Sequence, residues 1–187
     1  YRLGGNKNDE GRGIAVDSSG NVYITGHFYK TTAFDPLHVA HSIAVDGKPT
    51  SILSSNTNNK SDVFFAKYNT DGIYQWAYSV GKERLEQGLG IAVDESGNVY
   101  ITGRFRKTVD FDPSNVDADG DSLVTDADSI LSSKLNTRHD LFFAKYDTNG
   151  VYQWAYDFGD TKPDEGLGIA VDESGNVYIT GQFYKTV

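Results

Sequence analysis

Cysteine and methionine are both absent from the 187-residue chain. Without cysteine there is no disulfide framework, no thiolate zinc site and no cysteine nucleophile. Basic runs are also missing. The chain has 17 Lys and Arg against 26 Asp and Glu, a net charge of −9, which argues against a protein that binds nucleic acid through clustered cations. The longest apolar runs are four residues, too short for a membrane span of about 20 residues.

Because methionine is missing even at residue 1, we expect Tyr1 not to be an encoded start and the chain to be a processed product, a fragment or part of a longer polypeptide. Aromatic residues, in contrast, are plentiful, at 13% with 12 Tyr and 10 Phe. That content is too high for a disordered acidic chain and predicts a packed core. The 20 glycines against 4 prolines indicate many tight turns.

Internal repeats dominate the sequence. The segment GIAVD at 13–17 recurs at 90–94 and 168–172, and GLGIAVDESGNVYITG at 88–103 returns letter for letter at 166–181. Identity of that length excludes chance and gives a repeat of 77 or 78 residues. The chain therefore divides into a first unit at 1–78, a second at 79–156 and the start of a third at 157–187.

Each unit reads as four short strands and essentially no helix. In the first unit these strands are expected at Gly13–Asp17, Asn21–Thr25, Val63–Tyr68 and Ile73–Tyr78. Four antiparallel strands, repeated, are typical of a β-propeller blade, in which each sheet covers its neighbour. The fold class is therefore all-β, a partial β-propeller. The apolar first strand belongs beside the central channel, and Trp76 and Trp154 belong at equivalent, largely buried places on the outer fourth strand.

The run G-I-A-V-D-x-S-G-N-V-Y-I-T-G resembles the repeat of the bacterial seven-bladed β-propeller family. F-D-P at 34–36 and 111–113, and the D-[VL]-F-F-A-K-Y segments at 62–68 and 140–146, are similar to the variant in large secreted bacterial proteins. The resemblance covers nearly the whole chain except the long connections. It implies a propeller fold, an extracellular place and, for most members, no assigned activity. The units here are longer because the connection between the second and third strands is enlarged.

The enlarged connection lies on the face of a propeller where ligands usually make contact, because it shares that face with the loops between blades. It reads as a small extra hairpin, of Ser42–Val45 with Thr50–Leu53 in the first unit and of Ser122–Thr125 with Ser129–Leu131 in the second. Two interpretations stay open: the hairpin only packs on the blade edge, or it forms a binding surface.

An acidic cluster in the second connection is the candidate metal site. Alternating carboxylates suit Ca²⁺, which takes six to eight oxygen ligands. The glycine of the cluster is at the fourth position rather than the sixth of an EF-hand loop, and the first unit retains only Asp46, so a calcium site and a solvated acidic loop both stay open. The candidate ligands are Asp117, Asp119, Asp121, Asp126 and Asp128.

Aspartates that recur in every unit are expected to cap turns, because a catalytic residue is needed once whereas a turn residue is needed in each blade. They are Asp17, Asp94, Asp172, Asp35 and Asp112.

Histidines follow a different pattern. Arg104 and Gln182 replace His27 at the equivalent positions, so the fold does not require His27. His38 and His41 are three residues apart and are either a transition-metal pair or two exposed loop residues.

Taken together, the sequence predicts an extracellular or cell-surface structural or adhesive protein that presents loops to another macromolecule and catalyses no reaction. The expected partners are other blades of the same chain or neighbouring copies, and a protein or glycan ligand, but neither nucleic acid nor a membrane span. Calcium is the one expected cofactor. Two alternatives are a sugar-binding, lectin-type propeller and a propeller lyase or hydrolase whose active site lies outside this chain.

Overall fold

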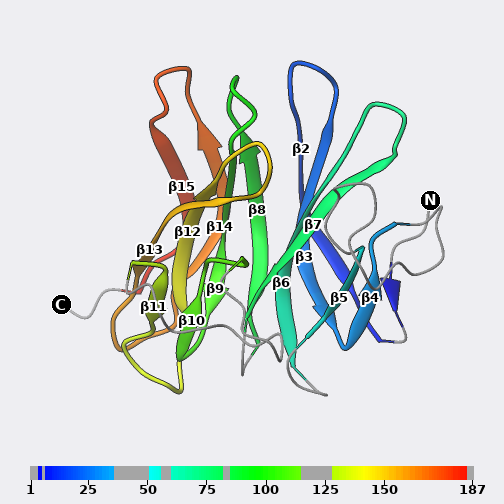
Figure 1. Cartoon of the computed structure of the whole chain (residues 1–187). Helices are drawn as coiled ribbons and strands as arrows, with labels where there is room; N and C mark the ends of the chain where they lie inside the picture. The colour runs from blue at the N-terminus through cyan, green and yellow to red at the C-terminus, as the bar shows by residue number, and fades with distance from the viewer. Residues whose placement is uncertain are drawn as a thin grey trace.

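The computed structural model describes residues 4–5, 7–35, 51–55, 60–81, 85–114 and 128–184. Within these ranges every regular element is a β-strand, as the sequence predicts, so this part of the chain holds no helix that could cross a membrane. The strands form three sheets that stand side by side, with two small sheets attached (Figure 1). This arrangement is a partial β-propeller and confirms the predicted fold class.

The first and second sheets each contain four antiparallel strands that are neighbours in chain order. The first comprises β2 (Glu10–Val16), β3 (Val22–Tyr29), β6 (Ser61–Tyr68) and β7 (Tyr74–Val80). The second comprises β8 (Gln87–Val93), β9 (Val99–Phe105), β12 (Asp140–Tyr146) and β13 (Tyr152–Phe158). The third sheet pairs β14 (Glu165–Val171) with β15 (Val177–Gln182).

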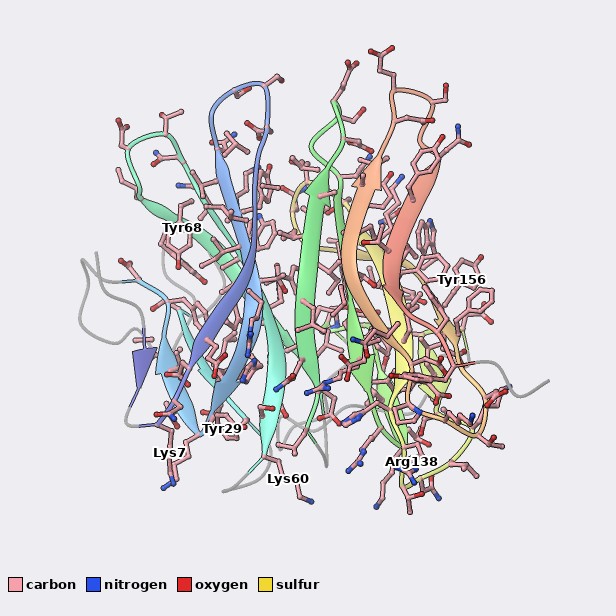
Figure 2. The ribbon with its side chains drawn as sticks, turned by 180° about the vertical axis from the view of Figure 1, so that it is seen from behind. Lys7, Tyr29, Lys60, Tyr68, Arg138 and Tyr156 are labelled. Atoms are coloured by element: carbon pink, nitrogen blue, oxygen red, sulfur yellow. The ribbon has the colours of Figure 1, made fainter. Side chains whose placement is uncertain are left out.

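The first strands of the three sheets, β2, β8 and β14, lie next to one another and form the row nearest the viewer in Figure 2. Glycine permits this close approach, because a Cβ on Gly90 would lie 3.1 Å from the Cα of Gly168. Ile91 on β8, between two neighbours, is 7% exposed, whereas the equivalent Ile14 on β2 is 70% exposed. The sheets therefore depend on neighbours at both faces to bury their apolar residues.

The tight turn after each first strand is held by its aspartate. Both oxygens of Asp17 accept hydrogen bonds, from the backbone N–H groups of Ser19 and Asn21, from the Asn21 amide and from the Tyr23 hydroxyl. Burial acts to raise the pKa of Asp17, but these bonds outweigh it and the pKa lies below its ordinary value. Asp94 and Asp172 repeat the pattern, which confirms their predicted capping role.

Aromatic residues fill the space between the first and second sheets. Phe65 and Tyr146 meet across it with ring centroids 4.3 Å apart. Trp76 on β7 is 5% exposed, as predicted, and its Nε1–H donates to the Thr148 carbonyl at 3.2 Å. Trp154, at the equivalent place on β13, is not exposed but is less buried than Trp76. The third sheet has two strands among the described residues, and nothing there covers Trp154 as the Thr148 turn covers Trp76.

The enlarged connections begin and end in small sheets. In the first unit β4 (Thr31–Ala33) pairs with β5 (Ile52–Ser54) and with β1 (Gly4–Gly5); in the second, β10 (Thr108–Asp110) pairs with β11 (Ile130–Ser132). The end of each connection, β5 or β11, therefore pairs with the strand at the start of the same connection, β4 or β10. Ser42–Val45 and Ser122–Thr125, the partners that the sequence predicted, lie outside the described residues.

These small sheets are part of the core rather than separate appendages. Phe34, just after β4, packs edge-on against Phe28 with ring centroids 6.0 Å apart, and lies 4.9 Å from Phe64. Phe111, Phe105 and Phe142 repeat this triangle in the second unit. The two ends of each connection are thereby fixed to the sheet below.

Candidate functional site: a polar belt across three sheets

The strands run further towards the connections than the sequence predicted. The first strand begins at Glu10 rather than Gly13, and the second ends at Tyr29 rather than Thr25. These extensions place one cross-strand pair of polar residues at the same register in each sheet. We call these six residues the polar belt: Glu10 and His27, Gln87 and Arg104, Glu165 and Gln182.

A β-bulge beside the belt is common to the three sheets. The register shifts between Gly11 and Gly13 in the first sheet, and at the equivalent glycines of the second and third. A bulge bends its strand and changes the direction of the neighbouring side chains. The same backbone device therefore orients the first belt residue of every sheet.

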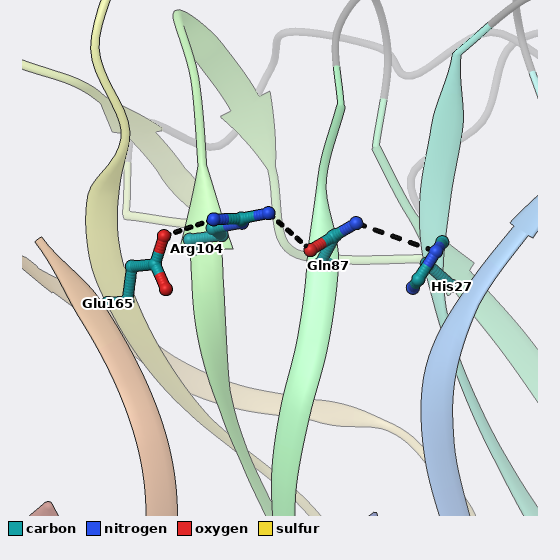
Figure 3. A network of polar contacts seen from close by, with 4 residues as sticks. All are labelled: His27, Gln87, Arg104 and Glu165. Carbon is teal, nitrogen blue, oxygen red and sulfur yellow. Dashed lines mark hydrogen bonds and ion pairs between the residues drawn. The ribbon is translucent and has the colours of Figure 1, made fainter. Parts of the chain in front are cut away.

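The belt residues bond from sheet to sheet (Figure 3). Arg104 donates to Gln87 Oε1 of its own sheet at 2.6 Å and to Glu165 Oε1 of the third sheet, with which it also forms an ion pair. On the other side, Gln87 Nε2 lies 3.4 Å from His27 Nε2 of the first sheet. A continuous chain of polar contacts thus links the three sheets near their inner strands.

The contacts of Gln87 indicate which ring nitrogen of His27 carries the proton. Arg104 has only donors, so the oxygen of Gln87 faces it and the amide N–H groups of Gln87 face His27. His27 Nε2 is then the acceptor, and the neutral ring carries its proton on Nδ1. Burial lowers the pKa of His27, with Glu10 opposing and the cations of Arg12 and Arg104 adding to the decrease, so the ring is neutral at pH 7.

His27 is 2% exposed, yet its Nδ1 has no hydrogen-bond partner among the described residues. A buried donor without an acceptor costs about 1–3 kcal/mol. The side chain also lines a pocket of about 420 Å³ together with Lys7, Asn8, Glu10 and Tyr29. Figure 2 shows Lys7 and Tyr29 at the end of the first sheet, away from its tight turns.

Two further titratable residues lie close to the belt in the second sheet. Burial lowers the pKa of His139 to about 4, and the cations of Arg106 and Arg104 act in the same direction. Burial raises the pKa of Asp140, the next residue, although the backbone N–H of Lys134 donates to it at 2.7 Å. Both groups are therefore shifted towards their neutral forms.

The residues predicted to bind calcium are not part of this belt. Asp117, Asp119, Asp121 and Asp126 lie outside the described residues, as do His38 and His41. Asp128 is described and exposed, and its backbone carbonyl accepts a hydrogen bond from the Tyr152 hydroxyl. The described part of the chain holds no group of three or more acidic or histidine side chains that could bind a metal ion. Calcium binding therefore stays a prediction.

Sequence reasoning noted the variation at His27 but did not assemble the belt. The signal was present in the repeats, since the identical segments 88–103 and 166–181 end on both sides at a belt residue. Gln87 becomes Glu165 before the identical segment, and Arg104 becomes Gln182 after it. Each identical segment is a β-hairpin, so the two variable positions at its ends face each other as a cross-strand pair.

Comparison with known proteins agrees with this organisation. The family described as Beta-propeller repeat matches residues 2–27, 87–104 and 153–182. Each match ends at a belt residue on the second strand, so the enlarged connection begins just after the shared part of the repeat.

Two curated proteins are similar to the chain. The "Uncharacterized WD repeat-containing protein L264" of Acanthamoeba polyphaga mimivirus is 31% identical over 119 residues, which are 62% of this chain and 8% of that protein. The "Regulatory protein FlaEY" of Caulobacter vibrioides is 29% identical over 141 residues, 75% of this chain and 13% of that protein. The chain thus spans a small part of the length of either relative.

Proposed function

Because the chain belongs to the β-propeller repeat family, we propose that it is a non-catalytic binding module of an extracellular or cell-surface protein. The module holds a macromolecular ligand on the face that carries the polar belt and the enlarged connections. Further blades, from the same polypeptide or from neighbouring copies, cover the open faces of its outer sheets. The resemblance of its repeats to those of large secreted bacterial proteins supports the extracellular place.

The observation that carries this proposal is the variation of the belt within nearly identical repeats. The backbone register and the bulge are the same in all three sheets, but the second-strand belt residue is His27, Arg104 or Gln182. If the contact had only a structural role, the same residue would serve at this position in every blade. Different side chains on one backbone frame are instead expected where a surface recognises a particular partner.

The chemistry of the belt supports binding rather than catalysis. Its members offer donors and acceptors of both charges, with Arg104 and Glu165 only partly exposed, at 27% and 20% of their side chains. Among the described residues, His27 makes no hydrogen bond to a hydroxyl that it could activate as a nucleophile. The small sheets β4–β5 and β10–β11 lie in the half of the molecule away from the tight turns (Figure 1), which extends the surface beyond the belt.

Binding of the fluorescently labelled protein to intact cells of the source organism tests the proposal. We expect saturable binding that excess unlabelled protein displaces. The double variant Arg104→Gln, Glu165→Gln should weaken binding because it removes the two ion-paired charges of the belt together and leaves neither unpaired. Glu95→Ser is the matched control: Glu95 is exposed in the tight turn at the opposite end, and the first unit has Ser18 there. Absence of saturable binding, or equal loss in the control, contradicts the proposal.

A further inference from the structure

The pocket beside His27 lies where the first sheet differs from the second at both belt positions, since Glu10 and His27 stand where the second sheet has Gln87 and Arg104. In the second sheet the guanidinium of Arg104 lies between Gln87 of its own sheet and Glu165 of the next. The equivalent flanking residues in the first sheet are Glu10 and Gln87, again one carboxylate and one amide. Histidine is shorter than arginine, and the pocket of about 420 Å³ opens beside it.

The wall of this pocket is held in place by the fold. Asp9 accepts hydrogen bonds from the backbone N–H of Tyr29 at 3.0 Å and of Gly5 at 2.6 Å. Its second oxygen also accepts from the hydroxyl of Thr32 at 3.2 Å. Asp9 therefore ties β3 to the small sheet, and Tyr29 packs edge-on against His27 with ring centroids 5.9 Å apart. A wall fixed in this way loses little entropy when a ligand binds.

The polar groups of the pocket have bonding capacity to spare. The side chains of Lys7, Asn8 and Tyr29 make no hydrogen bond to any described residue. Glu10 is engaged through one oxygen, in an ion pair with the half-exposed Arg12. His27 adds a buried ring whose Nδ1 has no acceptor within the described ranges and is not itself accessible to solvent. The accessible side chains of the pocket thus offer both donors and acceptors.

The balance of charge selects the ligand. The lining brings one cation, Lys7, and one anion, Glu10, together with neutral His27, Asn8 and Tyr29. An anionic ligand gains from Lys7 what it loses to Glu10, and a cationic ligand the reverse, so a net charge of either sign brings no advantage. A hydroxyl group can donate to Glu10 and accept from Lys7 with equal ease. The matching ligand is neutral and carries several adjacent hydroxyls, and the pocket volume is within the range of roughly 300–1,000 Å³ for small ligands.

We propose that this pocket is a saccharide site that binds the hydroxyls of a neutral pyranose through Lys7, Asn8, Glu10 and Tyr29, beside the buried ring of His27. The inference rests on the proposed binding function and names its ligand class. The pyranose is either a free sugar or part of a glycan chain, since both present the same hydroxyls.

An array of neutral, sialylated and sulfated glycans, followed by calorimetry with methyl pyranosides and with the neutral oligosaccharides bound, tests the site. We expect binding of neutral glycans. A binding heat with methyl pyranosides would show that the site accepts a free sugar. A binding heat with oligosaccharides alone would show that it requires a sugar within a glycan chain. Binding to no glycan, or only to acidic glycans, overturns the inference. The cell-binding experiment is independent of this result, so the broader proposal can survive that failure.

Variants locate the site. His27→Arg installs the side chain that the second sheet has at this position, so it should fold normally, fill the pocket and abolish saccharide binding. Tyr29→Phe should lower the affinity roughly tenfold, the loss of one hydrogen bond. Tyr184→Phe, at the equivalent position of the third sheet, should leave it unchanged. Full saccharide binding by a folded His27→Arg protein, judged by its thermal transition, rules out this pocket.

Discussion

Two tryptophans at equivalent positions provide a test of how far sheet-to-sheet packing stabilises this protein. Trp76 lies among the rings of Tyr23, Phe65 and Tyr78 at centroid distances of 6.2, 5.8 and 5.6 Å. Trp154 has the same three ring neighbours from its own sheet, at 6.1, 5.8 and 5.4 Å. The two sites differ in the cover from the next sheet, which Trp76 has and Trp154 does not have within the described residues.

The expected losses follow from that difference. A fully buried aromatic side chain covers about 150–250 Å², worth roughly 4–6 kcal/mol at 25 cal/mol per Å². Large-to-small changes at core aromatics cost about 3–5 kcal/mol, so Trp76→Ala should cost about 4 kcal/mol. This figure includes about 1 kcal/mol for the hydrogen bond to Thr148. Trp154→Ala should cost about 2 kcal/mol, because within the described residues no further sheet covers the indole.

Urea unfolding followed by far-ultraviolet circular dichroism measures both losses without relying on tryptophan fluorescence. The slope of the unfolding free energy against urea must stay constant for the midpoints to be compared. A difference of about 2 kcal/mol between the variants is expected. Equal losses would refute the reasoning, since they would mean that Trp76 gains nothing from the second sheet or that Trp154 is covered in solution.

The remaining predictions concern acidity, the bulge and calcium. From pH 7 to pH 5 the unfolded chain takes up a proton that folded His139, with its pKa of about 4, does not. Stability should therefore fall by about 1–2 kcal/mol through this residue, and urea titrations of His139→Ser should show a smaller pH dependence. Gly103→Ala should lower the free energy of unfolding by more than about 3 kcal/mol, because the new Cβ would lie 1.9 Å from a carbonyl oxygen. Gly11→Ala should not have this effect, because no atom lies within 4 Å of a Cβ at that position. Calorimetry should detect calcium with a Kd of roughly 10⁻⁴ to 10⁻³ M, lost in Asp119→Ala, Asp121→Ala; no heat in the native protein reduces the cluster to a solvated acidic loop.

The centres of the strands could be predicted because local signals agree there. GIAVD and NVYIT combine β-branched and aromatic residues with a turn of Asp, Gly and Asn between them. The strand ends could not be predicted in this way. Glu10, Gly11 and Arg12 have weak strand preference, and they extend β2 only because β3 continues beside them and supplies hydrogen-bond partners.

The pairing at the base of the connection shows the same limit. A hairpin local to the connection was predicted because its strands are close in sequence. Ile52–Ser54 instead pairs with Thr31–Ala33, since the entropy cost of closing a loop grows only slowly with its length. The pairing is stabilised by the packing of Phe34 on Phe28 and Phe64, a tertiary contact without a local sequence signal.

The identity of the repeated segments and the variation of the belt residues are related through the backbone that they share. The glycine that faces each bulge leaves no room for a side chain, since a Cβ on Gly26, Gly103 or Gly181 would lie within 2.0 Å of the facing carbonyl oxygen. The backbone next to the belt is therefore restricted to one shape, and the identical segments 88–103 and 166–181 preserve it. The belt positions lie just outside these segments, and their residues differ between sheets that share one backbone register. His27, Arg104 and Gln182 are thus three residues on one frame, and replacing one by another should change what the surface binds while the sheet remains folded.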